Sequence, residues 1–221
     1  MATPKWESKS FPRSNPEYHH SMVSPGSLRE IYSPAIERAV LKSLTRLDGH
    51  CRRFIGKSPF LCLSTQGHNG ADVSPRGDQP GFVHILDDST LAIPDWRGNN
   101  RLDSLTNITQ NPLVGLLFLI PGVDETLRVN GAAVISIDPE VTQSWNVTGK
   151  HPASALIVTV HEAFLHCAKA LIRSRLWHDD YKIDRAELPS YGQMLKDQIE
   201  VKESAAELEN SIADAYKNRL Y

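Results

Sequence analysis

Residues 72–131 decide how this chain folds; they read DVSPRGDQPGFVHILDDSTLAIPDWRGNNRLDSLTNITQNPLVGLLFLIPGVDETLRVNG. Three runs of strand-forming residues come first, then a polar segment that leads into a helical pattern, then two further strands. Asp87-Asp88-Ser89 separates the second and third runs as a hairpin turn does. The helical pattern covers residues 100–111 and ends where Asn111 precedes Pro112.

The flanking regions continue this alternation of strands and short helices. Ser33-Pro34 is typical of a helix start, and apolar residues follow at helical spacing, which predicts a helix over residues 34–47. The strand predicted at residues 126–137 is long enough to need a bend, which Gly131 would supply. We also expect helices around 50–56, 139–147 and 167–177, and strands at 60–65, 71–76, 82–86, 90–93, 114–120 and 155–160.

Six or seven short strands with interrupting helices indicate a mainly β, α+β fold. The expected architecture is a small antiparallel barrel decorated by helices, because no regular βαβ alternation is present. We predict an extended N-terminal arm over residues 1–30, which are rich in Pro, Ser and charged residues. The barrel domain is predicted over residues 31–185, and a charged, helical C-terminal extension over residues 186–221.

Composition excludes several functional classes. The 221 residues carry a formal net charge of −2, which gives no reason to expect nucleic acid as a partner. The longest apolar run, residues 114–121, is too short to span a bilayer, and the first 20 residues lack the apolar core of a signal peptide. Three cysteines at unrelated spacings do not form a disulfide scaffold. We therefore expect a cytoplasmic protein with neither nucleic acid nor membrane as a partner.

Two polar segments are candidates for holding an anionic ligand. Ser74-Pro75-Arg76-Gly77 lies on a predicted strand, and residues 97–101, RGNNR, lie just before the helical pattern. The first N–H groups of a helix have no partner within it, and the helix dipole is positive at that end. Arg76 and Arg101 would add charge-assisted hydrogen bonds, which suit a phosphate better than a neutral ligand. Asn100 with Asp103 also resembles a capping box, so a structural role alone is the competing interpretation.

The chain resembles the pyridoxamine 5'-phosphate oxidase-like group of FMN-binding split-barrel proteins. The resemblance is carried by FLCLSTQGHNGADVSPRGDQPGFVHILDDSTLAIPDWRGNNRLDSLTNITQNPLVGLLFLIPG (residues 60–122) and by ETLRVNGAA (residues 125–133). It implies an FMN-binding split barrel in which one strand and one helix start face the ribityl phosphate. Carried over, these are Ser74, Arg76, Asn99, Asn100 and Arg101.

The same resemblance implies further contacts with the cofactor. Ile93 and Pro94 would meet the isoalloxazine edge through backbone groups. Arg128 lies on a strand that crosses near the flavin in similar proteins, although a strand arginine is more often simply solvated. Lys169 and Arg173 would reach the cofactor or a partner subunit; the alternative is that both lie on the wet face of a surface helix.

The function implied is that of an FMN-dependent oxidoreductase acting on a small molecule. The Tyr, Arg-Pro and Ser pattern that binds substrate phosphate in the name-giving enzymes is not clearly present, since His151 stands where Arg is expected. The substrate and the catalytic residues therefore remain unidentified. The resemblance also implies a homodimer with FMN at the interface.

The alternative function is a flavin- or haem-binding split barrel without turnover, with His151, His161 and His166 as candidates for haem. No metal site is expected, because His161 and His166 are five residues apart, whereas the zinc-protease motif needs two histidines four apart.

Overall fold

The computed structural model describes residues 26–221; residues 1–25, which hold most of the predicted arm, lie outside them. The chain divides into two compact units at Ser43 and Leu44. In the described part of the first unit, α1 (Leu28–Ile31) and α2 (Glu37–Leu41) are short and contain no buried residues. Every element described below belongs to the second unit.

The helix predicted over residues 34–47 is wrong beyond Leu41. In the second unit the backbone of Leu44 pairs with Ala163 through two hydrogen bonds of 2.9 and 2.8 Å, and Leu47 is buried in the core. The apolar spacing that suggested one helix face therefore reflects a bridge to a strand and a core contact. Tertiary pairing has overridden local helix preference here.

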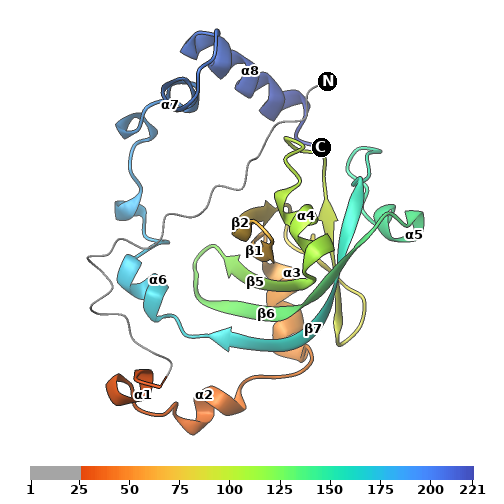
Figure 1. Ribbon diagram of the computed structural model, residues 1–221, viewed down its shortest axis with the longest axis vertical. Helices are drawn as coiled ribbons and strands as arrows, with labels where there is room; N and C mark the ends of the chain where they lie inside the picture. Colours follow the sequence, from red (N-terminus) through yellow and green to blue (C-terminus); the bar gives the residue numbers. More distant parts are fainter. Residues whose placement is uncertain (1–25) are drawn as a thin grey trace. The chain divides into compact units, whose positions relative to one another are not determined.

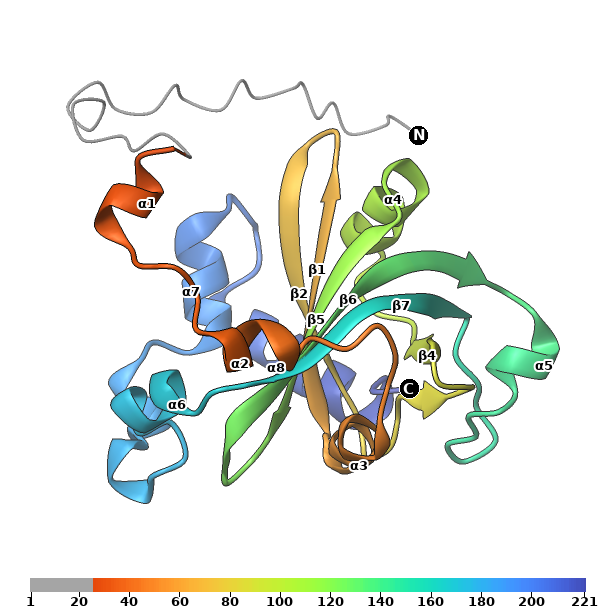
Figure 2. The same ribbon diagram turned by 90° about the horizontal axis from the view of Figure 1, so that it is seen from below.

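Seven strands form one antiparallel sheet in the order β2-β1-β5-β6-β7-β4-β3 (Figures 1 and 2). The sheet is not closed, and its α+β architecture confirms the predicted split-barrel fold class. The strands are β1 (Phe60–Gly67), β2 (Gly70–Gly77), β3 (His84–Ile85), β4 (Thr90–Asp95), β5 (Leu113–Ile120), β6 (Val123–Ser136) and β7 (Ser154–His166).

The helices of this unit are α3 (Gly49–Lys57), α4 (Asp103–Gln110), α5 (Pro139–Thr142), α6 (Lys169–Ser174), α7 (Tyr191–Gln198) and α8 (Ala205–Asn218), with short 3-10 turns η2 (Asp179–Tyr181) and η3 (Arg185–Glu187). The helices α3 and α4 contribute to the main core: Ile55 on α3 and Ile108 on α4 belong to the same cluster. In the part of the chain that the structure describes, no helix is long and apolar enough to cross a membrane.

The core lies on the inner face of the curved sheet. Phe118, Leu127 and Val129 are fully buried, and alternate residues of β1, β5 and β6 contribute to the same cluster. The bend predicted in β6 is confirmed, because its register with β7 shifts between Asn130 and Gly131. A side chain at Gly131 would collide with the Thr159 carbonyl, so the close approach of the two strands requires glycine.

The sheet topology determines what surrounds the candidate anion site. The inward positions of β2 alternate with exposed ones, so Asp72, Ser74 and Arg76 share one face. The end of β4 brings Asp95 opposite Ser154 of β7. The loop after β4 then leads into α4, which packs on β1 and β2.

Candidate functional site

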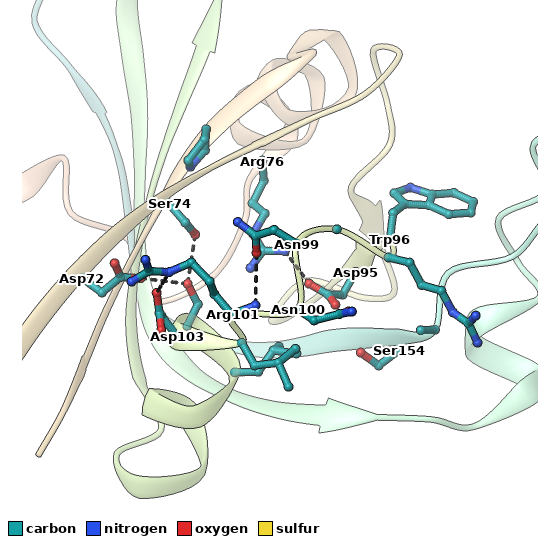
Figure 3. A pocket seen from close by; sticks show the side chains of 17 residues that line it. Asp72, Ser74, Arg76, Asp95, Trp96, Asn99, Asn100, Arg101, Asp103 and Ser154 are labelled. Carbon is teal, nitrogen blue, oxygen red and sulfur yellow. Dashed lines mark hydrogen bonds and ion pairs between the residues drawn. The ribbon is translucent and has the colours of Figure 1, made fainter. Parts of the chain in front are cut away.

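A cavity of about 470 Å³ lies between the inward face of β2, the end of β4 and the start of α4 (Figure 3). It is lined by Asp72, Ser74, Pro75, Arg76, Asp95, Trp96, Arg97, Gly98, Asn99, Asn100, Arg101, Leu102, Asp103, Ser104, Leu105, Ala153 and Ser154. Its size is within the range of small-molecule and cofactor sites. We call it the first cavity.

Five residues predicted to meet the phosphate are brought together at this cavity: Ser74, Arg76, Asn99, Asn100 and Arg101. Ser74 and Arg76 come from β2, and the other three come from the loop before α4, as expected (Figure 3).

Ile93 and Pro94 do not line the first cavity. Both are buried in β4, where they pair with Leu156 and Ala155 of β7.

Arg76 forms an ion pair with Asp95, and each side chain is at least four-fifths buried. The pair joins β2 to the end of β4, two segments that are not neighbours in the sheet. Arg76 uses Nη1 for this contact, while its buried Nε has no hydrogen-bond partner among the described residues. Buried N–H groups are almost always satisfied in folded proteins, so a donor left open beside a cavity indicates a ligand.

Arg101 lies at the more exposed end of the cavity. Its Nε donates to Asp103 Oδ2 at 2.7 Å, and this hydrogen bond raises the pKa of Arg101. Its backbone N–H donates to Asn99 Oδ1 at 3.1 Å, which folds the loop back on itself. The two Nη groups remain available for a ligand, because a guanidinium carries five donors.

The capping box predicted from Asn100 and Asp103 is wrong. The residue before α4 is Leu102, and it provides no side-chain cap. Asn100 and Leu102 both have left-handed backbones, with φ of 59°. Asparagine tolerates this conformation but leucine is strained in it, and such strain collects at ligand sites. The first N–H groups of α4 are consequently not covered by a capping side chain.

Carboxylates are the part of the site that sequence reasoning missed. Asp72, Asp95 and Asp103 line the cavity beside Arg76, Arg97 and Arg101, so its formal charges balance. Asp72 Oδ2 accepts from Ser104 Oγ at 3.0 Å, and Ser104 Oγ lies 3.0 Å from Ser74 Oγ. The alternation along β2 was a usable signal for Asp72, since residues two apart in a strand share a face.

A model of the pyridoxamine 5'-phosphate oxidase family matches residues 47–167 of this chain. The chain belongs to this family. The match includes β1–β7 and the whole cavity, and it ends before α6. The family resemblance that the sequence indicated is thereby confirmed.

Several solved structures are similar at low identity. HupZ of Group A Streptococcus is 15% identical with a TM-score of 0.45, over 54% of this chain and 93% of that chain. General stress protein 26 of Bacillus anthracis is 19% identical with a TM-score of 0.39, over 52% of this chain and 88% of that chain. An F420 reductase is 18% identical with a TM-score of 0.38, over 52% of this chain and 94% of that chain. A search of curated proteins found no match.

Three other residues that were predicted to contact the cofactor lie apart from the first cavity. Arg128 of β6 stacks on Phe164, with the guanidinium carbon 5.1 Å from the ring centroid, and lines a different cavity beside Cys62. Lys169 and Arg173 are exposed on α6. Within one chain, therefore, the structure does not bring these cations to the predicted phosphate contacts.

The three histidines named for haem do not converge. His151 and His166 line different cavities, and His161 is exposed at the β-bulge opposite Asn130 and Gly131.

The donors at the first cavity fit the phosphate end of a flavin nucleotide. The open Nε of buried Arg76, the Nη groups of Arg101 and the uncapped start of α4 all suit an anion. Ser74 adds a hydroxyl. Asp95 and Asp103 do not oppose this fit, because each is already paired with an arginine, while Asp72 accepts a hydrogen bond from Ser104.

Proposed function

We propose that this protein binds FMN in the first cavity and acts as an FMN-dependent oxidoreductase on a small molecule. The observation that supports this most strongly is the buried Nε of Arg76, which borders the cavity and has no partner among the described residues. Membership of the pyridoxamine 5'-phosphate oxidase family supports the same cofactor class.

In this proposal each residue has a stated task. Arg76 donates Nε–H to the phosphate while its Nη1 keeps Asp95 paired, so the buried carboxylate is never left alone. Arg101 donates from its Nη groups while its Nε stays on Asp103. Ser74 and the first N–H groups of α4 complete the phosphate contacts.

Bound FMN would supply the electron transfer, and the protein would supply binding, orientation and exclusion of water. Trp96 borders the cavity, and its buried Nε1 has no hydrogen-bond partner among residues 26–221. That donor is available to a polar atom of the cofactor or the substrate.

The experiment that tests the proposal compares FMN with riboflavin, which lacks the phosphate. Purified protein should bind FMN, turn yellow and release the flavin on heating. Arg101→Ala should weaken FMN about tenfold and leave riboflavin nearly unchanged, because only FMN offers a charge-assisted contact. Arg76→Lys should also weaken FMN more than riboflavin. Lysine keeps a positive charge for Asp95 but lacks the Nε donor that the guanidinium offers to the phosphate.

Arg52→Ala is the matched control, since Arg52 also forms an ion pair at the surface, with Asp88, but does not line the cavity. It should change neither affinity. Protein that stays colourless with added FMN contradicts the cofactor assignment, and equal losses for both flavins contradict the phosphate contacts. Oxidation of NADH or NADPH by the loaded protein, with dioxygen as acceptor, then tests for turnover.

A further inference from the structure

A second cavity, of about 1070 Å³, adjoins the first and shares the loop of residues 96–100 with it. Its other walls come from residues 150–153 and from the end of α8 with the residues that follow. It is lined by Trp96, Arg97, Gly98, Asn99, Asn100, Lys150, His151, Pro152, Ala153, Ala215, Tyr216, Arg219, Leu220 and Tyr221. The α8 wall lies outside residues 47–167, which match the family.

Specific contacts hold the end of the chain against this cavity. The Tyr221 hydroxyl donates to Asp78 Oδ1 at 2.8 Å, and its ring meets Trp96 edge-on with centroids 5.0 Å apart. Lys150 Nζ donates to the Tyr221 carbonyl oxygen at 2.8 Å. All three contacts are made by Tyr221, so this one residue holds the wall against Asp78, Trp96 and Lys150.

The helix that carries the wall is itself positioned by α7. The N–H of Gly192 on α7 donates to Glu209 on α8. A Cβ at Gly192 would lie 2.7 Å from the Ala205 carbonyl oxygen, so only glycine permits this approach. A hydrogen-bonded capping box of Ser204 and Glu207 begins α8 at the same end.

The second cavity differs from the first in its charge. Arg97, Lys150 and Arg219 line it together with His151, and no Asp or Glu side chain is among the lining residues. Arg97 forms no ion pair with any described residue, and Arg219 has only an exposed contact of 3.6 Å with Asp214, which lies outside the lining. The unbalanced positive charge favours an anionic occupant.

Aromatic side chains give the cavity flat surfaces. Trp96, Tyr216 and Tyr221 all line it, and Tyr216 is 65% exposed although it is a large ring. Tyr216 lies in the last turn of α8 and Arg219 is the residue that follows the helix, so both stand at its C-terminal end beside the cavity. Aromatic side chains with a few charged groups beside them suit a planar molecule that carries an anionic group.

We propose that the second cavity binds a planar aromatic anion as the substrate, with the C-terminal helix α8 deciding which anion is accepted. That this anion is the substrate rests on the proposed function, because the flavin site adjoins the second cavity and shares Trp96 and the loop that follows. Lys150, Arg97 and Arg219 hold the charged group, and Tyr216 and Trp96 contact the ring.

The test titrates full-length protein with 4-nitrobenzoate and with its neutral counterpart 4-nitrobenzamide, measuring heat on binding. Both titrations are run on FMN-treated and on untreated protein. We expect the anion to bind at least about tenfold more tightly than the amide, and to weaken as salt is raised. Equal binding of the two compounds overturns the proposal.

Three variants locate the site. Lys150→Met removes one charged contact together with the hydrogen bond to Tyr221, so it should weaken the anion about tenfold and the amide less. Tyr216→Ala should weaken both compounds, because the ring surface is lost. Lys182→Met is the matched control: this lysine is exposed and ion-paired with Asp179 but lies outside the cavity. Unchanged binding in Lys150→Met and in Tyr216→Ala overturns the assignment.

A fourth variant tests α8 without touching the lining. Gly192→Ala should loosen α8 from α7 and weaken anion binding, while circular dichroism shows the sheet unit still folded. Unchanged anion affinity in Gly192→Ala contradicts a deciding role for α8.

The two proposals fail in different ways. If FMN itself fills the second cavity, Lys150→Met lowers FMN affinity and FMN competes with nitrobenzoate, which overturns the substrate site alone. If the protein does not bind FMN but still prefers the anion, only the flavin proposal falls.

Discussion

The ion pair between Arg76 and Asp95 allows stability and ligand binding to be separated in one set of variants. Both side chains are more than four-fifths buried, with 19% and 15% exposed. Arg76→Met leaves the Asp95 carboxylate without its partner in a largely dry position. Removing one member of a fully buried pair costs about 3–5 kcal/mol, and the residual exposure places this case near 3 kcal/mol.

The double variant Arg76→Met with Asp95→Asn should recover most of that loss. With no charge left at either position, desolvation is no longer penalised, and replacing both members of a pair is often close to neutral. We expect the double variant to lie within about 1 kcal/mol of the natural protein and the double-mutant cycle to give a coupling of at least about 2 kcal/mol, larger by whatever Asp95→Asn alone costs. Urea unfolding of flavin-free protein, followed by circular dichroism, gives the free energies of unfolding.

Flavin affinity should not recover with stability. Arg76→Met removes the proposed phosphate donor in both the single and the double variant, so FMN should remain about tenfold or more weaker than in the natural protein. The affinity for riboflavin should be nearly the same in the single and the double variant as in the natural protein, because riboflavin has no phosphate. If the loss of unfolding free energy in the double variant equals the sum of the losses in the two single variants, Arg76 and Asp95 are not energetically coupled. If FMN affinity returns in the double variant, Arg76 acts on FMN only through folding.

Three further predictions concern the thiols, a half-buried histidine and the assembly. Burial raises the pKa of the Cys51 thiol to about 11, so at pH 8 a thiol reagent should modify exposed Cys167 first and Cys51 only on unfolding; rapid loss of both thiols contradicts this. Burial lowers the pKa of His84 below 6.5, so stability should be complete above that pH and fall as the pH drops through the folded pKa. Because His84 stacks on Trp145 at 4.2 Å, its protonation should change tryptophan fluorescence, and His84→Asn should abolish that change. Light scattering should give a homodimer, the commonest soluble assembly; a monomer with FMN fully bound contradicts an interface site.

Strand patterns in this sequence were readable because they are local. Alternation along residues 71–76 indicates a strand with one inward face, and β2 appears in the structure as predicted. The strand predicted at residues 82–86 is reduced to His84–Ile85, because Phe82 and Val83 are held as buried loop residues. The Phe82 carbonyl accepts from Trp145 Nε1 at 2.7 Å, a contact 63 residues away that no local pattern reports.

The site was predictable to the same extent. Asn99, Asn100 and Arg101 could be placed at a helix start from sequence, but the left-handed backbone at Asn100 and Leu102 could not, since leucine gives no signal for it. The partner of Arg76 was hidden for a different reason. Asp95 reaches Arg76 only because β4 pairs with β7 in a register that brings Asp95 opposite Ser154, and that register is decided by contacts distant in sequence.

In the two proposals, flavin binding and substrate choice depend on different parts of this chain. The family match ends at residue 167, so it covers the first cavity but not Tyr216, Arg219 or Tyr221. The loop of residues 96–100 borders both cavities, and a molecule in the second therefore lies beside the proposed flavin site. If the second cavity holds the substrate as proposed, the charge and the aromatic rings at the end of α8 bear on substrate choice more directly than the residues that match the family. Changing Tyr216 or Lys150 should consequently alter which molecules bind while FMN affinity stays the same.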